Sequence, residues 1–331
     1  MTLWLSFAAC SLAILIAGSL LCRYGDEIAR LSGLGGTWIG AVLMATVTSL
    51  PELMTGLSAV TAAAAPDVAV GDVLGSCVFN LAMIAVLDVL QRPASVYSIA
   101  GRGHIIATAF AALMLALVGG ALLVGRRFDA AVLHVSVVTP VVLLLYLFAM
   151  NTIFRFELGQ RSESTRAPPQ PGALRRAIAR YAGAAVAVVA AAAALPFLAV
   201  EIAQRMGWTQ GFVGTSLVAL TTSLPELTVT IAAWRLKAVD LAIGNLVGSN
   251  LFNLAILAVD DLAYLPGPLL SAVSITHAVS AFAAIGMSAA VIVALMAPPR
   301  ARLLNLASWV SVLLVMLFFA NAWTHFRHPA L

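Results

Sequence analysis

The chain has 331 residues, of which 62% are hydrophobic and only 10% are charged, and its mean hydropathy is +1.03. Soluble domains carry about 25% charged residues, so the composition excludes a soluble protein and predicts an all-α polytopic membrane protein surrounded by lipid. The formal net charge of +4 follows from membrane topology and indicates no nucleic-acid partner.

Ten apolar segments are long enough to cross a bilayer, which takes about 20 residues per helix. In chain order they are residues 2–22, 37–61, 66–88, 103–125, 130–151, 178–200, 210–233, 239–259, 271–297 and 303–323. The first segment lacks the basic start and the small-residue cleavage site of a signal peptide, so we expect a retained helix.

A hydrophilic stretch separates the fifth segment from the sixth. Residues 155–177 are rich in Ser, Pro, Gln and Arg, a composition typical of a linker, and they divide the chain into residues 1–154 and 178–331. Most Lys and Arg residues lie in this linker or in loops on its side of the membrane. The positive-inside rule therefore predicts a cytoplasmic linker with both termini outside. The compact, Ala- and Arg-rich chain favours a prokaryotic inner membrane.

The two halves repeat the same motifs. The pentad "TSLPE" occurs at residues 48–52 and 222–226, within matching blocks at residues 40–88 and 214–261. These blocks also contain "GDVLGSCVFN" and "GNLVGSNLFN". Because an odd number of spans separates the copies, the second is inverted relative to the first, as in secondary transporters. The predicted fold is therefore ten transmembrane helices arranged as two inverted five-helix repeats.

The proline of each pentad predicts a broken helix. Pro51 has no N–H group to donate to the carbonyl of Val47, and Pro225 has none for the carbonyl of Thr221. In hydrocarbon such carbonyl groups are costly unless they find a partner, and a cation is one such partner. We expect the two broken helices to meet near the middle of the membrane.

Polar residues around the prolines share helical faces. The broken spans carry Ala45, Thr48, Ser49 and Glu52 in the first half, and Ala219, Thr222, Ser223 and Glu226 in the second. The spans that follow carry polar stripes, formed by Asp72, Ser76 and Asn80 and by Asn245, Ser249 and Asn253. A charge at the bilayer centre costs about 2.5–3.5 kcal/mol, which argues against a merely structural role for the two Glu residues. The Ser and Asn stripes could instead join helices by hydrogen bonds.

Oxygen ligands of this kind suit hard cations. Two carboxylates balance the charge of one Ca²⁺, two Na⁺ or two protons. The chain contains no catalytic motif of an intramembrane enzyme, and nothing in it indicates a cofactor or an obligatory protein partner. The three cysteines indicate neither a disulfide framework nor a zinc site. Asp88, Asp260 and Asp261 lie near span ends and are predicted to be solvated, and the five histidines receive no role.

The paired motifs resemble a known family. "ATVTSLPEL" with "GDVLGSCVFN", and "ALTTSLPEL" with "GNLVGSNLFN", are similar to the two α-repeats of the sodium/calcium exchanger family, within the cation/Ca²⁺ antiporter superfamily. The resemblance implies an ion transporter rather than an enzyme, in which Ca²⁺ and Na⁺ take turns at one midplane site by alternating access. An H⁺/Ca²⁺ antiporter that uses the same two Glu residues stays open as the alternative.

The resemblance also implies ligand roles for individual residues. Glu52 and Glu226 would bind Ca²⁺ through both carboxylate oxygens, with Thr48 and Thr222 completing its position. The further ligands would be the carbonyls of Ala45 and Ala219, the hydroxyls of Ser49, Ser223, Ser76 and Ser249, and the amide oxygens of Asn80 and Asn253.

Two positions depart from the family pattern. Asp72 stands where Asn is common, and the second repeat has Asn245 there. Our hypothesis is that Asp72 adds a third negative charge to the ion pathway. Cys77 stands where the family usually has Asn, as the second repeat does at Asn250.

Overall fold

The computed structural model describes residues 2–32, 45–92, 94–101, 103–124, 131–158, 172–303 and 306–327. Long helices make up most of these segments: α1 (Thr2–Ser32), α3 (Leu50–Thr61), α4 (Pro66–Leu90), α6 (Gly103–Val124), α7 (Val138–Leu158), α8 (Ala173–Met206), α11 (Leu224–Arg235), α12 (Val239–Ala263), α14 (His277–Met296) and α15 (Trp309–Arg327). Shorter elements connect them: α5 (Val96–Ile99), α9 (Gln210–Val213), the π-helix η2 (Gly214–Val218), α10 (Ala219–Thr222) and α13 (Leu269–Ala272). Strands β1 (Ala131–Val132) and β2 (Val135–Ser136) pair as a small antiparallel hairpin.

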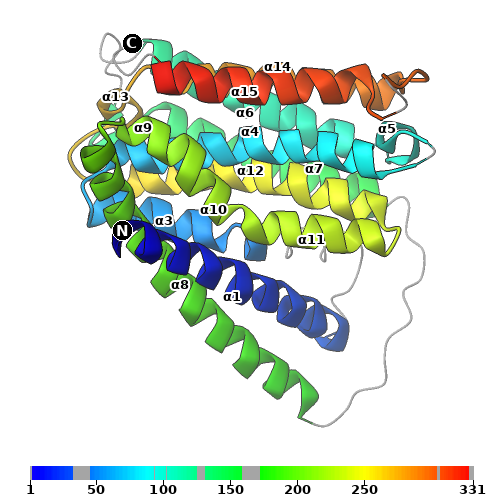
Figure 1. The fold of residues 1–331 in the computed structure, drawn as a ribbon, viewed down its shortest axis with the longest axis horizontal. Coiled ribbons are helices and arrows are strands. Elements are labelled where there is room, and N and C mark those ends of the chain that lie inside the picture. Colours follow the sequence, from blue (N-terminus) through cyan, green and yellow to red (C-terminus); the bar gives the residue numbers. More distant parts are fainter. Residues whose placement is uncertain are drawn as a thin grey trace.

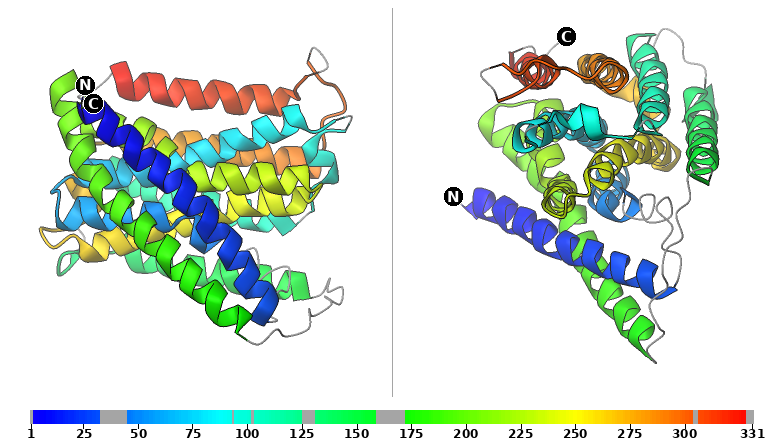
Figure 2. Two further views of the ribbon diagram at one scale, coloured as in Figure 1. Left: turned by 60° about the horizontal axis from the view of Figure 1, so that its bottom comes forward. Right: turned by 90° about the vertical axis from the view of Figure 1, so that its right-hand side faces the viewer.

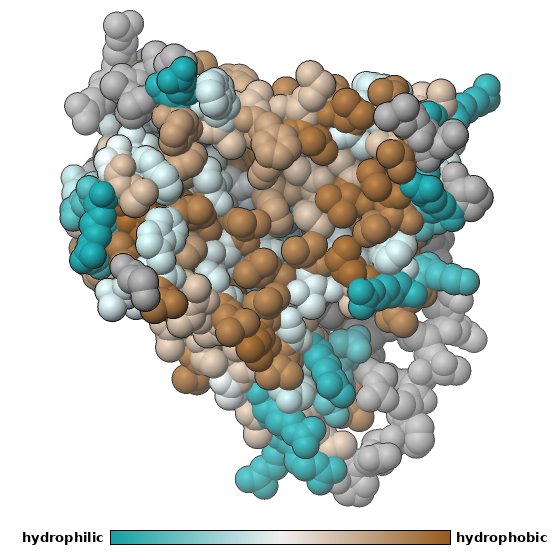
Figure 3. All heavy atoms as spheres, viewed as in Figure 1, coloured by the Kyte–Doolittle hydropathy of each residue, from teal (hydrophilic) through white to brown (hydrophobic). Residues whose placement is uncertain are grey.

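The helices confirm the predicted fold class of an all-α polytopic membrane protein. In the described part of the chain, eight helices are long and apolar enough to cross a membrane, and a bent pair, residues 210–222 and 224–235, makes a ninth span. The remaining predicted span, residues 37–61, lies partly outside the described residues, and its described part contains α3. Figure 3 shows apolar side chains spread over the lateral face, with hydrophilic side chains toward the ends.

Three predicted spans begin later in the structure than their hydropathy suggests. The spans predicted at 130–151, 271–297 and 303–323 become helical only at Val138, His277 and Trp309. The residues before them form the β1–β2 hairpin, α13 with its following turn, and a turn with a bridge between Leu303 and Ala307. In each connection one backbone N–H group donates to an aspartate of the other half: Ser136 to Asp261, Ser274 to Asp67 and Ser308 to Asp88.

Helices α4 and α12 form the centre of the molecule. They pack against each other, and 72% and 78% of the residues in their apolar windows are buried, compared with 33% for α1 and for α8. Helices α6, α7, α14 and α15 lie around this central pair, while α1 and α8 cross the bundle obliquely on one side (Figures 1 and 2). The central position explains why the polar stripes of α4 and α12 are removed from lipid.

An aspartate near the end of α4 ties three segments together. Asp88 was expected to be solvated, but its side chain is fully buried. Its Oδ1 accepts hydrogen bonds from Ser95 Oγ at 2.7 Å and the Val96 N–H at 3.1 Å. Its Oδ2 accepts from the Ser308 N–H at 2.9 Å and from Ser311 Oγ at 2.8 Å. Asp88 therefore holds the start of α5 in its own half and the start of α15 in the other half.

Asp261, the equivalent residue at the end of α12, makes the mirrored arrangement. It is also buried rather than solvated, with 1% of its surface exposed. Its Oδ1 accepts from the Leu269 N–H at 2.6 Å, and its Oδ2 accepts from the Ser136 N–H at 2.9 Å and from the hydroxyl of Thr139. Leu269 follows Asp261 by the same 8 residues by which Val96 follows Asp88. The two halves thus fasten each other by the same device.

Two Asp–His pairs also join the halves, with one partner of each pair in either half. Asp67, at the start of α4, lies 2.9 Å from Nε2 of His277 on α14. Asp240, at the start of α12, lies 3.2 Å from Nε2 of His104 on α6. The histidines were assigned no role from the sequence, and these two join one half of the chain to the other.

The close approach of α4 to the other half requires a glycine. A Cβ atom added to Gly75 would lie 2.4 Å from the carbonyl oxygen of Thr215 and 2.7 Å from Cβ of Ala219. The first of these contacts is with backbone, which cannot rotate away. Gly75 therefore allows the stripe of α4 to reach the broken helix of the second half.

We predict that Gly75→Ala destabilises the protein by about 1–3 kcal/mol, because the added methyl group overpacks this contact. Gly120→Ala is the matched control, since Gly120 also lies in a helix and its added Cβ would meet nothing within 4 Å. Thermal unfolding of both variants in detergent provides the measurement. Equal stability of the two variants would show that α4 does not pack this closely.

Candidate cation-binding site

Each TSLPE pentad lies at a helix break, as its proline predicted. Ser49 and Ser223 have nearly identical non-helical backbone angles, with φ −88° and ψ 14° in the first and φ −84° and ψ 8° in the second. Each serine precedes a helix that has Pro51 or Pro225 in its first turn. In the second half the helices on either side of Ser223 are bent by 43°. The break turns the side chains of each pentad toward the centre of the bundle.

The two glutamates are held crosswise. Both Glu52 and Glu226 are completely buried. Ser49 Oγ of the first half donates a hydrogen bond to Oε1 of Glu226 at 3.0 Å, and Ser223 Oγ of the second half donates to Oε1 of Glu52 at 3.1 Å. Each pentad therefore binds the carboxylate of the other. A hydrogen bond to a charged group contributes about 1.5–3 kcal/mol.

The serines of the polar stripes complete the same cluster. Ser249 Oγ of α12 lies 3.4 Å from Oε1 of Glu226 and 3.3 Å from Oγ1 of Thr48. Ser76 Oγ of α4 lies 2.9 Å from Oγ of Ser223. The two pentads and the stripe serines Ser76 and Ser249 thus come together in one place. We call this place, together with the rest of the two stripes, the cage.

Asp72 brings a third carboxylate to the cage. It is fully buried, and its Oδ1 accepts a hydrogen bond from Oγ1 of Thr222 at 2.8 Å, across the two halves. Its counterpart Asn245 stays within its own half, with Nδ2 at 3.4 Å from the carbonyl oxygen of Glu226 and 3.3 Å from Oγ1 of Thr230. The substitution of Asp for Asn therefore changes both the charge and the partner of this position.

The asparagines differ in how they are held. Asn80 donates from Nδ2 to Oδ1 of Asn250 at 3.1 Å, and Asn250 donates from Nδ2 to the carbonyl oxygen of Cys77 at 3.3 Å. The side chain of Asn253 is fully buried and makes no hydrogen bond within the described structure. Asn250 was not among the predicted site residues, although its place in the second "GSNLFN" block could have indicated it.

The two alanines of the cage, Ala45 and Ala219, lie where a helix of the other half approaches closely, which leaves little room for a larger side chain. The Ala45 Cβ lies 3.2 Å from where a Cβ of Gly248 would be, as Ala219 faces Gly75 in the other half. The carbonyl oxygen of Ala45 accepts a hydrogen bond from the Ser49 N–H at 3.1 Å, and that of Ala219 accepts from the Ser223 N–H at 3.1 Å. The role of these carbonyls as Na⁺ ligands stays a prediction.

The cage presents oxygen atoms that no hydrogen bond satisfies. They are Oε2 of Glu52 and Glu226, Oδ2 of Asp72, and Oδ1 of Asn80, Asn245 and Asn253, all buried and without a partner among the described residues. Buried polar atoms in folded proteins are normally paired, so a group of acceptors of this size fits a bound cation. No three His, Cys, Asp or Glu side chains of the described residues are grouped to hold a metal. A cation at this place would therefore need amide and hydroxyl oxygens as well as carboxylates as its ligands.

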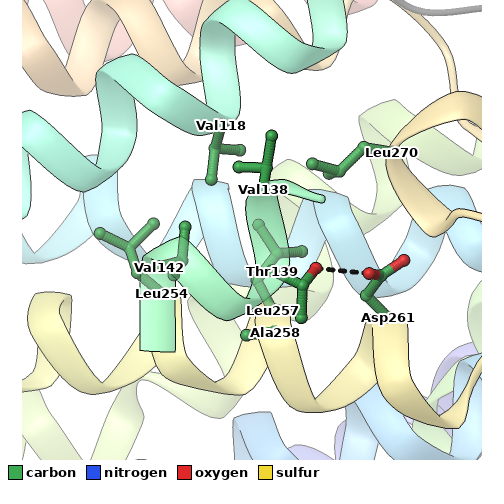
Figure 4. Close-up of a pocket in the computed structure, with 9 residues that line it drawn as sticks. All are labelled: Val118, Val138, Thr139, Val142, Leu254, Leu257, Ala258, Asp261 and Leu270. Atoms are coloured by element: carbon green, nitrogen blue, oxygen red, sulfur yellow. Dashed lines mark hydrogen bonds between the residues drawn. The ribbon is translucent and has the colours of Figure 1, made fainter. Parts of the chain in front are cut away.

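A pocket elsewhere in the structure does not belong to the cage. It opens where α6, α7, α12 and α13 meet (Figure 4), and mostly apolar side chains line it: Val118, Val138, Thr139, Val142, Leu254, Leu257, Ala258, Asp261 and Leu270. Its one carboxylate, that of Asp261, accepts a hydrogen bond from Thr139 and binds backbone N–H groups. Such a lining does not suit a cation.

Comparison with known proteins agrees with the fold and the motifs. The sequence model of the sodium/calcium exchanger protein family matches residues 2–156 and 177–326. The inner membrane protein YrbG of Escherichia coli (strain K12) is 28% identical over 262 residues, which cover 74% of this chain and 77% of that protein. The sodium/calcium exchanger MaX1 of Methanosarcina acetivorans is 44% identical over 63 residues, which cover 19% of this chain and 18% of that one. The solved structure of the sodium-calcium exchanger NCX_Mj, soaked with Na⁺ and Sr²⁺, has the same fold, with a TM-score of 0.64, 20% identity, and coverage of 97% of this chain and 99% of that chain.

Fold, repeats and family match together define the class of cation/Ca²⁺ antiporters, which are transporters rather than enzymes. The chain belongs to the sodium/calcium exchanger family. The predicted fold class and the predicted family are both confirmed. The boundaries of the two halves at residues 154 and 178, and the ligand roles of the cage residues, stay predictions.

The hydrogen bonds of Ser49 to Glu226 and of Ser223 to Glu52 can be distinguished by mutation from hydrogen bonds within one pentad. In a double-mutant cycle on the free energy of unfolding, we expect Ser49→Ala to couple with Glu226→Gln by about 1–3 kcal/mol, because both substitutions weaken the same charge-assisted hydrogen bond. Ser49→Ala should be close to additive with Glu52→Gln, which belongs to its own pentad. The mirrored cycles with Ser223→Ala provide the control, and the opposite pattern of coupling would contradict the crosswise arrangement.

Proposed function

We propose that this protein exchanges Ca²⁺ for Na⁺ across a membrane by alternating access at the cage. The observation that carries the proposal is the crosswise pair of buried glutamates. Glu52 and Glu226 each have one oxygen held by a serine of the other half and one oxygen without a partner. An ion bound between these free oxygens would join the two halves of the chain.

Charge balance supports exchange rather than free passage. Ionised carboxylates buried in a membrane cost about 2.5–3.5 kcal/mol each, so a cage without cations resists closing. One Ca²⁺ or two Na⁺ ions neutralise Glu52 and Glu226 equally well and favour the closed state. Ligands shift such an equilibrium by their differential binding to the open and closed states, and here both ions would favour closure. The empty return step is thereby suppressed.

The two oblique helices are placed to open and close the cage. Helix α1 lies against the break in the second half, where a Cβ on Gly18 would be 2.5 Å from the Pro225 ring and Ser11 Oγ is 3.1 Å from Thr221 Oγ1. Helix α8 lies against α3 of the first half, where Thr55 Oγ1 donates to the Ala192 carbonyl oxygen at 3.2 Å. We propose that α1 and α8 slide over the bundle and expose the cage to each side in turn.

We further propose that the linker at residues 155–177 is cytoplasmic and that both termini lie outside. In this orientation α3 and α12 run outward, and the loops rich in Arg lie inside, as the positive-inside rule requires. The ions Ca²⁺ and Na⁺ are then the substrates and membrane lipid is the surroundings. No cofactor enters this mechanism.

The proposed exchange predicts ⁴⁵Ca²⁺ uptake into proteoliposomes that are loaded with Na⁺ but not into those loaded with K⁺. Glu52→Gln and Glu226→Gln should each abolish uptake, since the ion would lose the carboxylate ligand from one half of the chain and could no longer join the two halves. A vesicle population with a pH gradient and no Na⁺ gradient runs alongside. Uptake driven only by the pH gradient would assign the cage to H⁺/Ca²⁺ antiport, and absence of uptake under both gradients would refute Ca²⁺ exchange.

Asp72 offers a separate test of charge in the cage. We propose that its carboxylate contributes a third negative charge, and we predict that Asp72→Asn lowers the affinity for Ca²⁺ about tenfold, or about 1.4 kcal/mol. The matched reciprocal variant is Asn245→Asp, which adds a carboxylate at the equivalent position and should raise the affinity. Isothermal titration with Ca²⁺ measures both. An unchanged affinity in Asp72→Asn would reduce Asp72 to a hydrogen-bond acceptor for Thr222.

A further inference from the structure

One buried carboxylate lies outside the cage. Asp260, near the end of α12, was expected to be solvated, but its side chain is fully buried. Neither of its oxygens has a hydrogen-bond partner among the described residues. Its neighbour Asp261 differs entirely, because three donors from two connecting segments and α7 hold that carboxylate. Unlike Asp261, Asp260 therefore holds no neighbouring segment by a hydrogen bond among the described residues.

The Asp260 carboxylate rests directly on the backbone of α3. A Cβ added to Gly56 would lie 2.3 Å from Oδ2 of Asp260 and 2.6 Å from Oδ1. Any residue larger than glycine at position 56 would push the carboxylate away. The pair Gly56–Asp260 is thus a close contact between the two halves of the chain.

This contact lies on the continuation of the cage. Gly56 follows Glu52 by one helical turn on α3, about 6 Å along its axis. Asp260 follows Asn253 by two turns on α12, about 10 Å along that axis and on the same helical face. Both helices run from the cage toward the end of the bundle at which α13 lies (Figure 1). A cation that travels between α3 and α12 from that end would pass Asp260 before it reaches Glu52.

The surroundings of Asp260 carry no balancing positive charge. Of the helices packed against α12, α3 contributes Glu52, α4 contributes Asp72 and α11 contributes Glu226, and Asp72 repels an ionised Asp260. Other titratable groups of these helices are engaged elsewhere. His104 of α6 binds Asp240 at the opposite end of α12, and Tyr146 of α7 packs on Phe252. On α4, Asp67 binds His277, and Asp88 holds the starts of α5 and α15. No described Arg, Lys or His forms an ion pair with Asp260.

The chemistry of the position selects a proton. Ca²⁺ takes six to eight oxygen ligands, whereas Asp260 offers one carboxylate without a hydroxyl or amide in hydrogen-bond contact. A proton needs a single oxygen atom and removes the charge that would otherwise be buried. When Asp260 is ionised instead, its negative charge at the entrance speeds the arrival of cations.

We propose that Asp260 is a proton-binding gate at the outer entrance of the cage. It holds a proton while α3 and α12 are packed together, and it releases that proton to the water of the open pathway when the helices part. The ionised carboxylate then attracts the incoming cation toward Glu52. The proposal rests on the alternating access and the orientation proposed above.

Two variants of the full-length protein test this gate. Asp260→Asn keeps the size of the side chain but can neither bind nor release a proton, and Asp261→Asn is the matched control one residue away. The first readout is infrared difference spectroscopy of the purified protein on addition of Ca²⁺. We expect a C=O stretching band of a protonated carboxylic acid that is lost in Asp260→Asn and retained in Asp261→Asn. The same band in wild type and Asp260→Asn would overturn the proposal.

The second readout is the external pH dependence of ⁴⁵Ca²⁺ uptake. We expect uptake by Asp260→Asn at neutral pH to be about tenfold slower than in wild type, because the charged entrance is lost. Acidification from neutral pH should slow the wild type more than this variant, since only the wild type has a gate to protonate. Identical pH profiles would contradict the proposal.

A third variant, Gly56→Ala, perturbs the same contact from α3 and leaves Asp260 itself unchanged. Its added methyl group should displace the carboxylate and shift the infrared band, and an unshifted band would argue against the contact. The infrared band requires no transport. Its presence would therefore support the gate even if the wild-type protein failed to carry Ca²⁺, so the two proposals can fail separately.

Discussion

The crosswise hydrogen bonds between the two pentads are the interaction on which the rest of the structure depends. Ser49 holds Glu226 and Ser223 holds Glu52, so neither carboxylate is stabilised by its own half alone. This arrangement needs two helix breaks at equivalent positions, and the prolines provide them. It also needs α4 and α12 each to lie close to the broken helix of the opposite half, which Gly75 and Gly248 allow. The free oxygens of the glutamates then follow from the same geometry, because each glutamate offers one oxygen to a serine of the other half and leaves the second without a partner among the described residues.

Much of this fold could be predicted from the sequence because the chain repeats itself. Hydropathy located the spans, the repeated pentad located the breaks, and helical spacing placed Ser76 and Asn80 on the same face as Asp72. The late start of α7, α14 and α15 could not be predicted in this way. Apolar residues before Val138 and Trp309 resemble a span in composition, and only the contacts of Asp261 and Asp88 with their backbone show that they fold back.

The partners of polar residues were harder to predict than their faces. Periodicity indicates which side chains point inward, but it does not show which residue of the other half they meet. The pairing of Thr222 with Asp72, and the support of Asn80 by Asn250, depend on how two separate helices cross. The burial of Asp260 was missed for the same reason, since its position near a span end suggested water, while Gly56 brings α3 over it.

The contacts exchanged between the halves have a consequence for the folding of such a chain. Asp88 and Asp261 each fasten a helix of the other half, and Asp67 with His277 mirrors Asp240 with His104. A protein made of a single half would leave Oδ2 of Asp88 and Oδ2 of Asp261 without these donors. In this chain the inverted half supplies them. Neither half is therefore expected to reach its native packing in the membrane without its inverted counterpart, so truncation after the linker should cost more than the loss of five spans.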